Sequence, residues 1–310
     1  MPAPLDMLRR LARLLPQNGR NRLRAWQLKS LDAWRGRRDP NISSTGESAD
    51  VERDCRFCAT ARVGHLVIGN VAPTHPGPFE HEDYRLLLCT LCEVVYLDPQ
   101  PSDRDLQTLY QDSVQFSDKT YSDDAAALRV LDSYTRRIDR LGLVPTAAQS
   151  VLEVGAGLAW VSRACKQRSP GVHTVAQDVS TECATACPWV DEYIVGTIQA
   201  VSREPRFAFA SMTHVIEHLI DPAVMLIEME ARMLRGGHIY ITAPYRPPLW
   251  KPREGIRPWL HYSYLHVPAH IAYLSQTWLR QAAAKARLEF VHWDDTHDGH
   301  QVFEAVLRKP

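Results

Sequence analysis

The stretch that decides the fold is Val151-Leu152-Glu153-Val154-Gly155-Ala156-Gly157-Leu158-Ala159. This apolar run carries one acidic residue and turns through two close glycines, and a helix-like segment, Trp160 to Gln167, follows directly. An open parallel α/β sheet builds a nucleotide pocket from a strand, a glycine turn and a helix, because glycines let the backbone approach the ligand and helix N–H groups face it. The dinucleotide version needs a third glycine where this chain has Trp160, so NAD and FAD are disfavoured.

A second predicted strand, Val172 to Asp178, ends in an acid that lies 21 residues beyond Gly157. This is close to the ~20 residues expected for a carboxylate that accepts hydrogen bonds from both hydroxyls of a ribose. The alternative is a surface Asp that caps the next helix, given Ser180 and Thr181 nearby. Combined with the glycine turn, the spacing favours the ribose interpretation.

The chain then repeats the pattern of a doubly wound sheet. A third strand covers Tyr193 to Val195, and a fourth, Phe207 to Met212, runs into Thr213-His214-Val215-Ile216-Glu217-His218-Leu219-Ile220-Asp221-Pro222. A helix (Ala223 to Leu234), a turn at 235–237 and a fifth strand (His238 to Thr242) come next. The helix Gln276 to Ala286 and two closing strands, 290–293 and 301–307, complete the expected sheet.

The ordered set "strand, Glu-His-Leu, Asp-Pro, helix, Leu-x-Gly-Gly, strand, Pro", together with Glu-x-Gly-x-Gly-x-Ala, resembles class I S-adenosylmethionine-dependent methyltransferases over residues 148–308. The resemblance implies a Rossmann-like α/β fold with a seven-stranded methyltransferase sheet, and S-adenosylmethionine as cofactor. It also implies that the cofactor is held by Glu153, Gly155, Ala156, Gly157, Asp178, Val179, Thr197 and Ile198.

His214, Glu217 and His218 are the candidate catalytic residues, since they share one face if their segment is helical and follow the end of a central strand. One interpretation is that His218, with Glu217 fixing its tautomer, removes a proton from the acceptor. A second is a divalent metal site, because the resembling quinone O-methyltransferases bind Mg²⁺ with Glu-x-x-Glu-His; His214 in place of the first Glu speaks against a hard cation. A third is the zinc-protease pattern His-x-x-Glu-His on a long helix. The last is that these side chains brace the fold.

Two CxxC pairs, Cys55-Cys58 and Cys89-Cys92, predict a structural Zn²⁺ site ahead of this domain. Each pair can fold into a tight knuckle, and four thiolates in a tetrahedron suit zinc and leave no open position. Short apolar runs at 66–68 and 84–88 supply the strands of a zinc ribbon. A zinc ribbon before this domain resembles methyltransferases of deoxysugar biosynthesis, polysaccharide clusters and natural products.

The first 40 residues hold ten Lys/Arg and three Asp/Glu, with leucines at helical spacing. We expect a basic amphipathic extension that packs on its own protein or on a second subunit, with a peripheral membrane surface or another partner protein as the alternative. The formal net charge is zero, so the chain as a whole does not attract nucleic acid, and a nucleic-acid partner is disfavoured. Seven cysteines, including the CxxC pairs, favour a reducing cytoplasm, with membrane-peripheral attachment as the alternative.

The predicted organisation is residues 1–50, extension and linker; 51–105, zinc ribbon; 106–147, helical connector and cap; and 148–310, methyltransferase domain. Aromatic residues and histidines crowd the proline-rich segment 245–270, which we expect to form a wall of the acceptor pocket. The predicted function is methyl transfer from S-adenosylmethionine to a nucleotide sugar, polysaccharide precursor or natural product. The alternatives are a non-catalytic adaptor that docks through its N-terminus, and an RNA methyltransferase.

Overall fold

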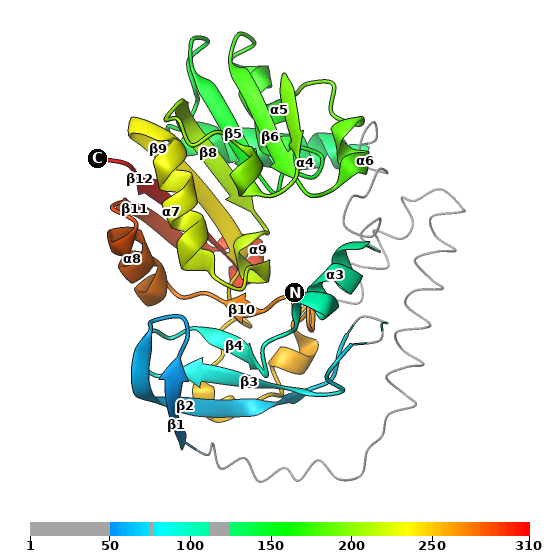
Figure 1. Cartoon of the computed structure of the whole chain (residues 1–310), viewed down its shortest axis with the longest axis vertical. Helices are drawn as coiled ribbons and strands as arrows, with labels where there is room; N and C mark the ends of the chain where they lie inside the picture. The colour runs from blue at the N-terminus through cyan, green and yellow to red at the C-terminus, as the bar shows by residue number, and fades with distance from the viewer. Residues whose placement is uncertain (1–49, 75–76, 78, 112–124) are drawn as a thin grey trace. The chain divides into compact units, whose positions relative to one another are not determined.

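The structure, a computed structural model, describes residues 50–74, 77, 79–111 and 125–310. The basic extension predicted for residues 1–40 lies outside the described residues. The described part contains two sheets, one of five and one of seven strands (Figure 1). None of its helices combines the length and the apolar character that crossing a membrane requires.

The seven-stranded sheet has the order β11-β12-β9-β8-β5-β6-β7. Its strands are β5 (Ser150–Val154), β6 (His173–Asp178), β7 (Glu192–Val195), β8 (Phe207–Thr213), β9 (Met233–Pro244), β11 (Glu289–Thr296) and β12 (Val302–Arg308). Strand β12 is antiparallel to both of its neighbours, and the remaining pairs are parallel. The order and the single reversed strand confirm the methyltransferase sheet that the sequence predicts.

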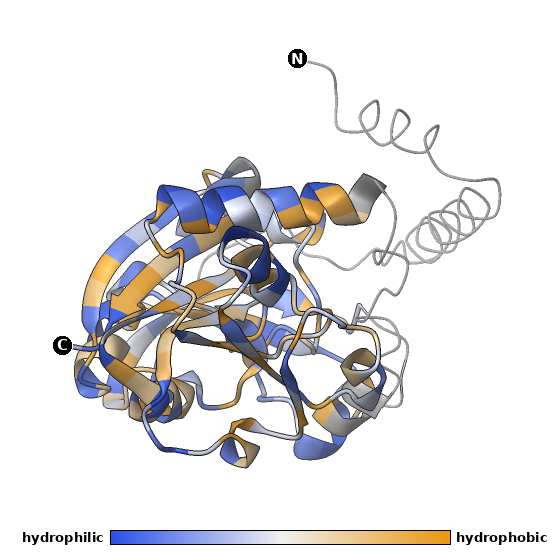
Figure 2. Ribbon diagram, turned by 90° about the horizontal axis from the view of Figure 1, so that it is seen from above, coloured by the Kyte–Doolittle hydropathy of each residue, from blue (hydrophilic) through white to orange (hydrophobic). Residues whose placement is uncertain are grey.

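Helices cover both faces of this sheet because alternate residues of each strand point to opposite sides. Leu152 and Val154 pack in the core that includes α7 (Pro222–Arg232) and α8 (Gln276–Lys285). Val151 packs in the core on the other face, with α4 (Ala125–Arg140) and α5 (Trp160–Arg168). These helices carry hydrophilic and hydrophobic residues in bands along their length (Figure 2), as amphipathic covering helices must. The other helices and 3₁₀ turns are α3 (Asp103–Gln111), α6 (Thr181–Ala184), α9 (His297–His300), η3 (Ile198–Ala200), η4 (Ile216–His218), η5 (Pro252–Glu254) and η6 (Trp259–His261).

The five-stranded sheet contains the predicted ribbon strands. It consists of β1 (Asp50–Cys55), β2 (Thr60–Val71), β3 (Tyr84–Cys89), β4 (Val95–Asp98) and β10 (Ala272–Tyr273). The first four follow one another in the chain, whereas β10 comes from beyond residue 270 and pairs with β4. Phe57 and Tyr96 share one continuous core with the face of the large sheet that α7 and α8 cover. The predicted ribbon and methyltransferase segments are therefore packed together.

Three aromatic residues of segment 245–270 have a packing role that the sequence does not predict. Trp250, Trp259 and Tyr262 are at most 6% exposed and pack against the five-stranded sheet, on Tyr84, Leu86 and other apolar residues of β2 to β4. Trp259 and Tyr262 are therefore not available for stacking on an acceptor, whereas Trp250 also reaches the lining of a cavity at the end of β9. The sequence pattern could not reveal this, because strands β2 to β4, which they cover, lie more than 150 residues away in the chain.

Two local predictions are also wrong. Residues 235–237 do not form a turn between helix and strand; they belong to β9, which begins at Met233. Backbone hydrogen bonds between Gly236, Gly237 and Lys309 extend the strand pairing there. The leucine spacing of the segment from Ala125 to Leu141 also predicts Leu128 on the buried face of α4, but that face is made of Ala127, Leu131, Thr135 and Ile138, and Leu128 is 61% exposed.

Candidate active site

The glycine turn follows β5 directly and leads into α5 (Figure 1). Gly155 and Gly157 have φ of 59° and 49°, the left-handed region in which glycine is not strained. A Cβ at Gly155 would lie 2.3 Å from Cγ2 of Val215, a residue of the loop after β8. The turn and that loop are thus in direct contact, which places the predicted cofactor residues beside the predicted catalytic ones.

Asp178 lies at the end of β6 and holds the turn through its carboxylate. Its Oδ2 accepts a hydrogen bond from the Gly157 N–H at 2.8 Å, and its Oδ1 accepts one from the Ser180 N–H at the same distance. The next residue, Val179, is 53% exposed although it is apolar. A half-buried carboxylate followed by an exposed apolar side chain fits the ribose and the base of a nucleoside.

Glu153 lies beneath the turn and is only 2% exposed. Its two carboxylate oxygens accept hydrogen bonds from the N–H groups of Val161 and Ser162, at 3.1 and 2.7 Å, in the first turn of α5. Burial raises the pKa of Glu153 to about 7, against the lowering effect of the bonds from Ser162. The carboxylate therefore binds the helix N-terminus, and its part in a cofactor site is to position the turn.

Of the two cofactor residues predicted after β7, Thr197 and Ile198, only one has an exposed side chain. Thr197 is exposed at this edge of the sheet. Ile198 is 3% exposed, and its side chain lies in the core with Leu226 and Met229 of α7. Of this pair, only the threonine side chain is open to contact with an adenine ring.

His214, Glu217 and His218 lie in the loop between β8 and α7 and not on a helix face. The only helical residues there are the three of η4, Ile216–His218. His214 has φ of 54°, a strained value for a residue other than glycine, and its N–H donates to the Thr242 carbonyl. The zinc-protease interpretation required a long helix, and the structure contradicts it.

The carboxylate of Glu217 nevertheless lies between the two imidazoles. Its Oε1 is 3.6 Å from Nδ1 of His214 and 3.8 Å from Nε2 of His218. The His214 ring also stacks on Tyr264, with centroids 5.9 Å apart. The three predicted catalytic side chains are thus grouped, although by a tight loop and not by helical spacing.

The tautomer of His218 is set by the backbone. Its Nδ1 lies 2.8 Å from the carbonyl oxygen of Ala269. Because a carbonyl only accepts, Nδ1 carries the proton and Nε2 is the basic nitrogen in the neutral ring. The predicted tautomer-fixing role of Glu217 therefore belongs to Ala269.

His270 is the neighbour that sequence reasoning missed at this site. It is 5% exposed, and its ring centroid lies 4.7 Å from that of His218. Burial, followed by the nearby His218 and His266, lowers the pKa of His270 well below 6.5. The crowding of histidines in segment 245–270 was the available signal, but their sequence spacing says nothing about distance to Glu217.

The four paired cysteines converge at one point of the five-stranded sheet. Their sulfur atoms all lie within 4.8 Å of one another, and Sγ of Cys55 is 3.7 Å from Sγ of Cys92. Sulfurs in a disulfide are about 2.05 Å apart. Tetrahedral Zn–S bonds of about 2.3 Å place them about 3.8 Å apart. The observed spacing therefore fits a tetrathiolate site for zinc.

A cavity of about 200 Å³ lies at the carboxyl end of β9. It is lined by Tyr245, Arg246, Pro247, Leu249, Trp250, Asp295 and His300. Its lining brings a guanidinium and a carboxylate together with aromatic and apolar groups, which suits a polar organic molecule.

The family model described as a methyltransferase domain matches residues 126–292 of this chain. The chain belongs to this methyltransferase family. It is an S-adenosylmethionine-dependent methyltransferase, and S-adenosylmethionine is the methyl donor that the glycine turn and Asp178 are suited to bind. This activity was the expectation from the sequence, and the non-catalytic alternative loses its support.

Solved structures of methyltransferases are similar to this chain in fold. The 1,6-didemethyltoxoflavin-N1-methyltransferase of Burkholderia thailandensis is 14% identical with a TM-score of 0.49, over 77% of this chain and 99% of that one. An S-adenosylmethionine-dependent methyltransferase of Mesorhizobium loti is 11% identical with a TM-score of 0.46, over 57% of this chain and 99% of that one. No curated protein matches this chain.

Proposed function

We propose that this enzyme transfers the methyl group of S-adenosylmethionine to a small hydrophilic acceptor, such as a nucleotide sugar, a polysaccharide precursor or a natural product. The observation that carries this proposal is the contact between Gly155 and Val215, which brings the cofactor turn against the loop of His214, Glu217 and His218. The cavity at the end of β9, with Arg246 and Asp295 in its lining, supports a polar acceptor.

In this mechanism the residues of the chain orient the donor and the acceptor, and one of them removes a proton from the acceptor. The glycine turn and Asp178 hold the donor, with Val179 and Thr197 at the base. Ala269 keeps the proton of His218 on Nδ1, so that Nε2 is the atom that accepts a proton from the acceptor. Most of the rate gain comes from alignment of the acceptor atom with the sulfonium methyl group.

We further propose that Cys55, Cys58, Cys89 and Cys92 bind a structural zinc ion, and that the enzyme works in the cytoplasm. All seven cysteines, each in the described part of the chain, are free thiols. Free thiols and a tetrathiolate cluster are typical of a reducing compartment. The basic extension, residues 1–40, is proposed to contact a second subunit or another surface.

The test is calorimetric titration of the purified chain with S-adenosylmethionine, after metal analysis of the same sample. We expect micromolar binding and a zinc ion in the cysteine cluster. A methyl-transfer assay with labelled donor then screens nucleotide sugars, saccharides and aromatic natural products. Labelling of nucleic acid but of none of these small acceptors would contradict the proposed acceptor class and favour the RNA alternative.

A further inference from the structure

The side chain of Glu217 is completely buried, and within the described part of the chain its carboxyl group has no hydrogen-bond donor and no Lys or Arg partner. Its exposed fraction is 0%, and neither carboxylate oxygen receives a hydrogen bond from a residue that the structure describes. The groups within ion-pair distance, among the described residues, are the imidazoles of His214 and His218. A buried carboxylate without partners is costly, so such a site is expected to hold a further positive group.

Two imidazoles beside this carboxylate are arranged as ligands. One donor atom each of Glu217, His218 and His270 lies within 4.8 Å of the others. The Nδ1 atoms of His218 and His270 donate to the carbonyl oxygens of Ala269 and Tyr264, at 2.8 and 2.7 Å. Bonds of this kind are the usual support of metal-binding histidines, because they fix the ring and leave Nε2 with its lone pair.

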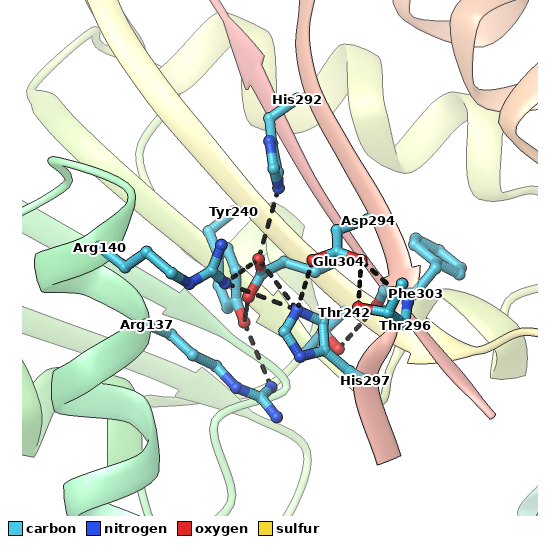
Figure 3. A network of polar contacts seen from close by, with 10 residues as sticks. All are labelled: Arg137, Arg140, Tyr240, Thr242, His292, Asp294, Thr296, His297, Phe303 and Glu304. Atoms are coloured by element: carbon cyan, nitrogen blue, oxygen red, sulfur yellow. Dashed lines mark hydrogen bonds and ion pairs between the residues drawn. The ribbon is translucent and has the colours of Figure 1, made fainter. Parts of the chain in front are cut away.

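A second buried carboxylate, that of Glu304, serves for comparison because it has both an arginine partner and a hydrogen-bond donor. Glu304, on β12, is also 0% exposed and lies close to His292 and His297 (Figure 3). Its Oε1 accepts a bond from the guanidinium of Arg140 at 2.5 Å, and its Oε2 accepts one from the Tyr240 hydroxyl at 3.0 Å. Arg140 thus supplies the positive charge for which Glu217 has no counterpart among the described residues.

We propose that Glu217, His218 and His270 bind one divalent transition-metal ion that prefers nitrogen ligands, of the Zn²⁺ or Co²⁺ kind. Two imidazole nitrogens and one carboxylate oxygen suit such an ion and do not suit Mg²⁺, which prefers oxygen donors throughout. Ligand atoms around an ion with bonds of about 2.1 Å lie about 3 to 3.4 Å apart, slightly closer than the 3.8 Å between Oε1 and His218 Nε2.

Three protein ligands leave at least one coordination position for a water or for an oxygen of the acceptor. The ion would lie in the loop that contacts the cofactor turn, so it belongs to the same site as the proposed methyl transfer. An ion bound at Nε2 of His218 would occupy the lone pair that the proposed function assigns to the base, so the two roles of this nitrogen exclude each other. Metal binding is measured without an acceptor, and its failure would leave the base role of His218 standing.

The test is a cobalt titration of the purified, zinc-loaded full chain, followed by desalting and elemental analysis. The wild-type chain is expected to take up one equivalent of Co²⁺, with a visible spectrum that lacks the thiolate-to-metal charge transfer of cysteine ligation. E217Q and H270A are each expected to lose this equivalent, and circular dichroism together with retained zinc shows that they are folded.

H292A is the matched control, because it removes a histidine beside the other buried carboxylate. It is expected to keep the full cobalt equivalent. Equal uptake by the wild type, E217Q and H270A would overturn the proposal. So would a loss of cobalt in H292A as large as in H270A, or a spectrum dominated by thiolate charge transfer.

Discussion

At the scale of single residues, Asp178 has the most testable role. D178A removes both the proposed ribose ligand and the acceptor of the Gly157 N–H, so the affinity for S-adenosylmethionine should fall at least about tenfold, or about 1.4 kcal/mol. Calorimetry measures the dissociation constant directly. The matched control is D221A, since Asp221 only caps α7 by accepting from the Val224 N–H. An unchanged constant in D178A would rule out the ribose assignment.

The buried carboxyl of Glu153 predicts a pH dependence of stability. Its pKa is about 7 in the folded chain and 4.5 as the ordinary value, so the folded state binds the extra proton between these two pH values. The unfolding free energy should therefore fall as pH rises from 4.5 to 7, by up to about 3 kcal/mol from this group.

E153Q isolates this contribution, because the neutral amide does not titrate. The stability of E153Q relative to wild type should increase as pH rises over that interval, as measured by urea unfolding at several pH values. Parallel stability curves for the two proteins would show that Glu153 titrates at its ordinary pKa in the fold.

At the scale of elements, the glycine turn makes a prediction about two similar substitutions. G155A introduces a Cβ 2.3 Å from Val215 in a left-handed conformation, and we expect it to cost about 3 kcal/mol or more and to abolish cofactor binding. At Gly157 a Cβ meets no described atom within 4 Å, so G157A should cost only the conformational strain of about 1 kcal/mol. Urea unfolding and calorimetry of both variants check this order, and equal effects would contradict it.

The elements also show what the sequence can predict. The strands and helices of the large sheet follow local patterns, and the structure confirms β5, α5, β6 and α8 nearly as expected. Local sequence patterns do not predict the structure of a segment whose conformation depends on contacts with residues far away in the chain. The sequence predicts a turn at Gly236 and Gly237. Their backbone hydrogen bonds with Lys309 place them in strand β9 instead. Segment 245–270 is predicted to form an acceptor wall, yet Trp259 is completely buried against β2 to β4 and only Trp250 of the two tryptophans also lines the cavity.

The same distinction holds for the site. Residue types at the right intervals were enough to predict that Asp178 and the glycine turn lie together and that the four cysteines converge, because each set is short or strictly spaced; their roles stay predictions. The hydrogen bonds from His218 to the Ala269 carbonyl and from the Ile271 N–H to the Glu217 carbonyl join two segments that lie more than 50 residues apart in the chain. No spacing within either segment could have predicted that they meet.

At the scale of the whole molecule, the shared core predicts that loss of the proposed zinc ion lowers the stability of the fold beyond the cysteine cluster. The Cys92 carbonyl accepts from the Ser275 hydroxyl, and the Phe57 carbonyl accepts from Trp278 Nε1, so the knuckles contact the first turn of α8. C89S should therefore lose zinc and lower the melting temperature of residues 50–310 in one cooperative transition. C183A, a buried cysteine outside the cluster, should keep its zinc. Two well-separated transitions in calorimetry would contradict the shared core.

Strand β10 is only two residues long, but the residue before it, Ile271, forms backbone hydrogen bonds to two different parts of the molecule. The Ile271 N–H donates to the carbonyl of Glu217, while the Ile271 carbonyl accepts from the Leu97 N–H of β4. A single residue, Ile271, thus connects the five-stranded sheet to the loop where the methyl acceptor is proposed to react. The five-stranded sheet would then help to position the loop that aligns the acceptor. A variant that contains only the seven-stranded sheet and its helices would still bind S-adenosylmethionine but would no longer hold the acceptor in line with the methyl group.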